Sequence, residues 1–109
     1  MSYLYLDVRA DAIHSRTRST SELRAFLRKD AELIERSAVE FGNSAGAPWL
    51  SLTMVKASPE GNFAVSGIDP GELNLVELIG SASEDPAAYW RIAERIAAFL
   101  GWEIVDVTP

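Results

Sequence analysis

The stretch from Asp85 to Thr108, DPAAYWRIAERIAAFLGWEIVDVT, predicts a buried helix followed directly by a strand. Asp85 can accept a backbone N–H at the start of a helix, and Pro86 suits the first helical position because its missing N–H is not needed there. The apolar residues that follow recur at helical spacing: Tyr89, Trp90, Ile92, Ala93, Ile96, Ala97, Phe99 and Leu100. Gly101 suits a left-handed helix cap, so we expect the last strand over residues 102–108.

A second clear pattern lies near the other end of the chain, where residues 3–10 alternate with a period of two. One side of this segment carries Leu4, Leu6, Val8 and Ala10, and the other side carries Tyr3, Tyr5, Asp7 and Arg9. Such alternation predicts a half-buried strand.

The segment after this strand predicts a long helix. Ser19 and Glu22 have the spacing of a capping box, and an apolar stripe runs from there to Phe41, with Gly42 as the stop. Leu33 fits the stripe poorly, and a bend at Asp30 could begin a second short helix.

Residues 49–57 and 62–68 alternate on either side of a turn at residues 58–61, which predicts a β-hairpin. A second turn at residues 69–72 precedes a third strand over residues 73–79. The segment LNLVELI in that strand is also compatible with two helical turns.

The predicted order is therefore β-α-β-β-β-α-β within a single domain over residues 1–109. This order indicates an α+β two-layer sandwich, with a mixed, largely antiparallel sheet of about five strands and both helices on one face. The opposite face, which carries Tyr3 and Tyr5, must then meet solvent or another molecule. Because aromatic residues are enriched in interfaces, we expect a partner or dimer contact there.

The composition is that of a globular protein, with 48% hydrophobic and 24% charged residues and no cysteine. No stretch approaches the roughly 20 apolar residues of a membrane helix, and the first ten residues lack the apolar run of a signal peptide. We therefore expect a cytoplasmic protein that has no contact with membranes.

The net charge of −6 is unevenly distributed along the chain. Residues 1–55 contain seven basic and seven acidic side chains, whereas residues 56–109 contain three basic and nine acidic ones. Acidic surfaces repel phosphate backbones and attract basic proteins, which disfavours nucleic acid as a partner. The side chains proposed to contact a basic partner are Glu72, Glu77, Glu84 and Asp85.

No catalytic, cofactor-binding or metal-binding motif is evident. His14 is the only histidine, and a triad of His14 with its neighbour Ser15 is disfavoured because adjacent side chains point apart. A solvated histidine, or one at the start of a helix, is the simpler interpretation. No G-x-S-x-G elbow and no E-x-x-H pair occurs, so we expect neither an enzyme nor a metal or cofactor site.

Three functional hypotheses follow. The first is a small acidic domain that binds a basic protein, for example an immunity or inhibitor protein that neutralises a basic toxin or nuclease. The second is a small-molecule or anion-binding domain, because guanidinium groups and a helix N-terminus both bind anions. Its proposed residues are Arg9, His14, Arg16 and Arg18. The third is a homodimeric structural subunit that self-associates through the open face of the sheet.

Overall fold

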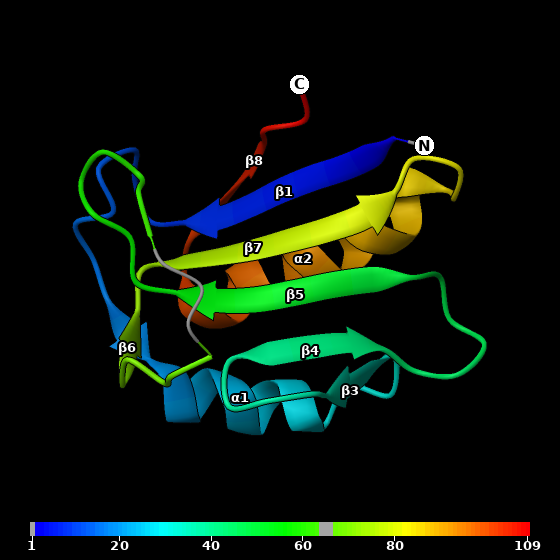
Figure 1. Ribbon diagram of the computed structural model, residues 1–109, viewed down its shortest axis with the longest axis horizontal. Coiled ribbons are helices and arrows are strands. Elements are labelled where there is room, and N and C mark those ends of the chain that lie inside the picture. The colour runs from blue at the N-terminus through cyan, green and yellow to red at the C-terminus, as the bar shows by residue number, and fades with distance from the viewer. Residues whose placement is uncertain (1, 64–66) are drawn as a thin grey trace.

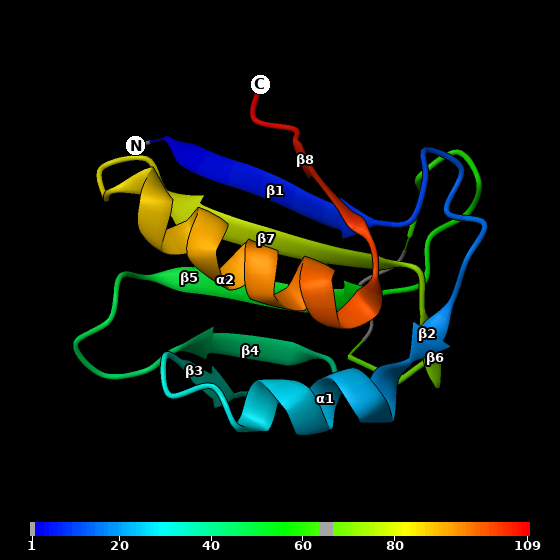
Figure 2. The same ribbon diagram turned by 180° about the vertical axis from the view of Figure 1, so that it is seen from behind.

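The computed structural model describes residues 2–63 and 67–109 as two packed layers (Figure 1). The strands are β1 (Tyr3–Arg9), β2 (Arg18–Ser19), β3 (Leu33–Glu35), β4 (Glu40–Asn43), β5 (Leu50–Val55), β6 (Glu72–Leu73), β7 (Leu75–Ser81) and β8 (Glu103–Asp106), and the helices are α1 (Thr20–Arg28) and α2 (Pro86–Leu100). A six-stranded sheet has the order β3-β4-β5-β7-β1-β8, and β2 pairs separately with β6. Both helices cover the same face of the six-stranded sheet (Figure 2). The predicted α+β sandwich is confirmed.

The two ends of the chain form the elements that the sequence predicts. The Asp85 side chain accepts the Ala87 N–H at the start of α2, and Gly101 ends the helix with a φ of 73°. β1 and β8 pair antiparallel, and β1 also pairs antiparallel with β7. The termini of the domain therefore meet at the β1 and β8 side of the sheet.

The long helix predicted after Ser19 is wrong beyond Arg28. Ser19 caps α1 by accepting the Glu22 N–H, but the N–H groups of Lys29 and Asp30 bond back to Phe26 and Leu27 and end the helix. The Asp30 carboxylate then accepts the Glu32 N–H and turns the chain into β3.

Residues 33–43 are a β-hairpin in place of that helix, because β3 and β4 pair antiparallel. Leu33 is buried with 7% exposure, whereas Ile34, which a helical stripe would bury, is 51% exposed. The buried side chains of Val39 and Phe41 follow a period of two. Tertiary pairing therefore prevails over a short stretch of compatible helical spacing.

The predicted hairpin over residues 49–68 is wrong in its second strand. The turn forms, since Gly61 donates its N–H to the Ser58 carbonyl at 2.8 Å. Residues 62, 63, 67 and 68 belong to no strand, and residues 64–66 lie outside the described residues. β5 pairs with β4 and β7 instead. The third predicted strand is confirmed as β6 and β7, and the helical alternative for it is excluded.

The core lies between the sheet and the two helices. Leu6, Val8, Leu52 and Leu78 project from the sheet with 0% exposure and meet residues of both helices. No helix among the described residues is long and apolar enough to span a bilayer.

Tyr89 attaches α2 to two strands of the sheet. Its side chain is 0% exposed, and its ring occupies the space above Gly80, where an added Cβ would come within 2.6 Å of the ring. Its hydroxyl donates to the Trp49 carbonyl at 2.7 Å and accepts the Ser81 N–H at 3.0 Å. One hydroxyl therefore holds the ends of β5 and β7 against the helix.

We predict that Tyr89→Phe lowers the free energy of unfolding by about 1–3 kcal/mol, because both backbone groups lose a buried partner. Urea denaturation of wild type and variant measures this difference. Tyr5→Phe is the control, since the Tyr5 hydroxyl bonds to none of the described residues. Equal stability of Tyr89→Phe and the control would contradict the prediction.

Candidate functional site

The face of the sheet opposite the helices is not covered by any described helix, and Figure 1 looks onto it. Alternation places on this face every second residue of each strand, between the buried positions that meet the helices. We call this surface the open face; its strand residues are Tyr3, Tyr5, Asp7, Arg9, Ile34, Glu40, Gly42, Ser51, Thr53, Val55, Leu75, Glu77, Ile79, Ser81, Glu103 and Val105. Val55 and Leu75 are buried in a small cluster with Ala57 and Phe63, which covers that end of the face. The expected position of Tyr3 and Tyr5 on it is confirmed.

Three carboxylates form a row across four strands of the open face. Asp7 in β1 lies directly opposite Glu77 in β7, Glu77 lies opposite Thr53 in β5, and Thr53 lies opposite Glu40 in β4. We call Asp7, Glu77 and Glu40 the carboxylate row. Directly opposed side chains in a sheet have Cβ atoms about 5 Å apart, so Asp7 and Glu77 are like charges in contact range.

The environment of Asp7 and Glu77 disfavours their negative charge. Burial raises the pKa of Asp7, and the nearby Arg9 and His14 offset only part of that rise. Burial also raises the pKa of Glu77, and the charge of Asp7 raises it further. Both carboxylates are half-buried without a cation to stabilise them fully, which is an unfavourable arrangement for an isolated fold.

Most basic side chains are engaged elsewhere. The ion pairs are Arg18–Glu22, Arg24–Asp69, Arg28–Glu35, Lys56–Glu72, Arg91–Glu32 and Arg95–Asp30, with further contacts of Arg24 to Glu35 and Arg95 to Glu32. Most of these pairs involve α1, α2 or the segments that flank them. No member of the carboxylate row forms an ion pair with a described residue. The side of the helices is thus largely neutralised, and the open face is not.

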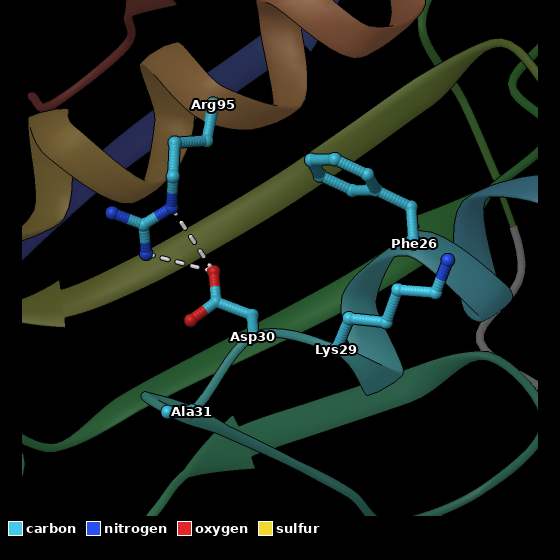
Figure 3. Close-up of a pocket in the computed structure, with 5 residues that line it drawn as sticks. All are labelled: Phe26, Lys29, Asp30, Ala31 and Arg95. Atoms are coloured by element: carbon cyan, nitrogen blue, oxygen red, sulfur yellow. Dashed lines mark hydrogen bonds and ion pairs between the residues drawn. The ribbon is translucent and has the colours of Figure 1, made fainter.

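A pocket of about 330 Å³ lies between the helices and illustrates this neutralisation (Figure 3). Arg95 binds the Asp30 carboxylate at its edge with a shortest distance of 2.7 Å. Phe26 forms its apolar wall and stacks on Phe99, with ring centres 4.3 Å apart. Asp30 and Arg95, two of the three charged residues that line this pocket, therefore already form an ion pair with each other, and Lys29 is the third.

An aromatic cluster lies at one end of the open face. Tyr3 and Trp49 have ring centres 5.7 Å apart, and Tyr3 and Tyr5 have centres 6.4 Å apart. Trp49 is 45% exposed and Tyr3 is 37% exposed, so both rings remain accessible. A pocket of about 440 Å³ is lined by Tyr3, Trp49, Ser81 and Glu84.

The structure does not bring the predicted partner-binding residues into one patch. Glu72 lies in β6 and pairs with Lys56, whereas Glu84 and Asp85 lie beyond the opposite end of β7 (Figure 1). Asp85 is engaged in capping α2. Glu77 lies between these ends on the open face, where its neighbours are Asp7 and Thr53.

The predicted anion-binding residues are also divided. Arg18 lies on the side of the helices, where it donates to the Leu100 carbonyl at 2.8 Å and covers the Phe99 ring. Arg16 is an exposed loop residue. Arg9 and His14 both lie close enough to Asp7 to lower its pKa, so they face a carboxylate that the chain itself supplies.

His14 is buried, which corrects the expectation of a solvated side chain. Its exposure is 8%, its φ is 54°, and its Nδ1 has no hydrogen-bond partner among the described residues. Asn74 donates its side-chain N–H to the His14 carbonyl and so fixes this loop against the sheet. The hydroxyl of Ser15 bonds to Asp11. The described residues contain no cluster of three or more His, Asp or Glu suited to a metal ion.

Sequence reasoning missed Glu40, which lies on the open face, and Trp49, which lies at the end of it. The sequence pattern predicts a helix at Glu40, so its alignment with Glu77 depends on strand pairings that the pattern does not reveal. The pattern marks Trp49 only as the start of a strand and does not indicate that its side chain is exposed. No known protein family, curated protein or solved structure matches the chain.

We predict that Glu77→Gln raises the free energy of unfolding at pH 7 by about 0.5 kcal/mol, the order of a cross-strand like-charge penalty. The folded-state pKa of Glu77 lies above its unfolded value. The Glu77 carboxyl therefore costs no stability at pH values below its unfolded pKa, near 4. The free energy of unfolding declines as the pH rises through the folded pKa, because the carboxyl then ionises in the folded protein. The gain should vanish at about pH 3, where the carboxyl is neutral in both states.

Urea denaturation at the two pH values measures this dependence. Glu94→Gln is the matched control because Glu94 is exposed on α2 and belongs to no ion pair among the described residues. A Glu77→Gln protein that is less stable than wild type at pH 7 would contradict the proposed repulsion.

Proposed function

We propose that this protein binds a basic protein partner through the open face, in a binding and not a catalytic role. The observation that carries the proposal is the carboxylate row, in which Asp7 and Glu77 lie opposite each other with raised pKa values. A cationic surface placed over this row would relieve the repulsion. Groups that destabilise a fold and persist in it are characteristic of functional sites.

The distribution of charge supports this choice of face. Ion pairs neutralise much of the surface around α1 and α2, whereas none of the carboxylates of the open face forms an ion pair with a described residue. The open face also carries Arg9, and Arg36 lies against Gly42, so four carboxylates there face two guanidinium groups. A net negative surface with aromatic residues at one end suits a cationic protein and accelerates its association.

An inhibitor of the immunity type is one form that this role takes. A rigid domain whose acidic face covers the basic active site of a toxin or nuclease would block access to it. The carboxylate row takes the place of the partner-binding residues proposed from the sequence. Glu77 is the one residue that belongs to both sets. Self-association through the same face is less favoured, because a twofold dimer would bring two carboxylate rows together.

A peptide rich in arginine and lysine is the probe for this proposal. We predict saturable binding, with backbone amide shifts in NMR spectra confined to β1, β4, β5 and β7. Asp7→Asn/Glu77→Gln should weaken binding by about tenfold, which corresponds to about 1.4 kcal/mol.

Glu22→Gln/Glu94→Gln removes the same charge from the side of the helices and serves as the matched control. Its affinity should stay within about twofold of wild type, since distant exposed charges are screened. Equal weakening by both double variants would mean that only net charge matters. Shifts confined to α1 and α2 would also overturn the proposal.

A further inference from the structure

The pocket at the aromatic end of the open face has one carboxylate and two accessible rings. Tyr3 and Trp49 provide the rings, and Glu84 and Ser81 complete the lining. The plane of one ring is tilted by 52° to the other, so they form two walls of a corner and not a closed stack. We call this pocket the aromatic corner.

The lining residues are held in place from below. The buried Tyr89 hydroxyl bonds to the Trp49 carbonyl and to the Ser81 N–H, and thereby fixes the backbone of both residues. The Glu84 N–H donates to the Ser81 carbonyl at 3.2 Å. A pocket with a fixed backbone loses less conformational entropy when a ligand enters it.

Glu84 is available to a ligand. It forms no ion pair with a described residue, and the neighbouring Asp85 performs the capping of α2. As a lining residue of the pocket, Glu84 therefore contributes negative charge that no described cation neutralises. Negative ring faces and a carboxylate attract a cation and repel an anion.

We propose that the aromatic corner binds an arginine side chain of the basic partner, an inference that rests on the proposed function. A guanidinium group is planar and can stack on Trp49 or Tyr3 while its N–H groups bind the Glu84 carboxylate in a fork. A lysine ammonium offers no such plane. Arginine is also among the residues that contribute most to binding energy at interfaces.

The position of the corner fits a partner that spans the open face. Tyr3, Tyr5 and Asp7 are alternate residues of β1 on the same face. Four residues of a strand extend about 14 Å, so one partner surface can place an arginine in the corner and other basic groups over the carboxylate row.

The test uses two peptides of one lysine-rich sequence, with either arginine or citrulline at a single position. Citrulline has nearly the shape of arginine but no charge, so the pair isolates the guanidinium charge. Wild type should bind the arginine peptide about tenfold more tightly in calorimetric titrations. Trp49→Leu/Glu84→Gln should bind both peptides equally, whereas Asp7→Asn/Glu77→Gln should bind both more weakly and keep the preference.

Glu84→Gln alone, in an exposed loop, provides a second variant if the double variant is unstable, and it should reduce the preference by at least about threefold. Glu94→Gln is the control and should keep the full preference. If both peptides bind the open face of wild type equally, the arginine pocket is wrong while the proposed function stands. If Trp49→Leu/Glu84→Gln keeps the preference for the arginine peptide, the arginine pocket is likewise wrong and the proposed function stands. If neither peptide binds the open face, both proposals fail.

Discussion

The opposition of Asp7 and Glu77 across β1 and β7 is the interaction on which the account depends. It arises because α1 and α2 both cover one side of the sheet, so the alternate residues of the central strands face outward. These two carboxylates are half-buried, close to each other and without an ion pair among the described residues, and burial raises the pKa of both. Neutral polar residues, such as Thr53 and Ser51 in the adjacent strand, would give a solvated surface without the repulsion between like charges.

The elements with strong local signals could be predicted from the sequence. Asp85, Pro86 and Gly101 set the bounds of α2, and the alternation in residues 3–10 identified β1 together with its two faces. The hairpin at residues 33–43 could not be predicted in this way, because its apolar spacing also fits a helix and its strands are fixed by the pairing of β3 with β4 and of β4 with β5. The poor fit of Leu33 to the helical stripe was the available signal, and its burial in β3 explains it.

The candidate site was predicted in part. Tyr3 and Tyr5 were expected on an open face, and the chain was expected to carry excess negative charge. The sequence placed that excess in residues 56–109, but position along the chain does not determine position on a surface. Glu72 and Glu84 lie beyond opposite ends of β7. Glu40, from the first half of the chain, where acidic and basic side chains balance, aligns with Glu77 through Thr53. Only the register of the sheet brings those carboxylates into one row.

The most direct measurement is the pKa of the Asp7 and Glu77 carboxyl groups, followed by NMR of their side-chain carbons, in the free protein and with the arginine- and lysine-rich peptide bound. We expect pKa values above the ordinary range of about 4 in the free protein, because burial and mutual repulsion favour the neutral forms. Both pKa values should fall when the peptide binds, since a nearby cation favours the charged forms. Ordinary values in the free protein that do not change with saturating peptide would contradict both expectations.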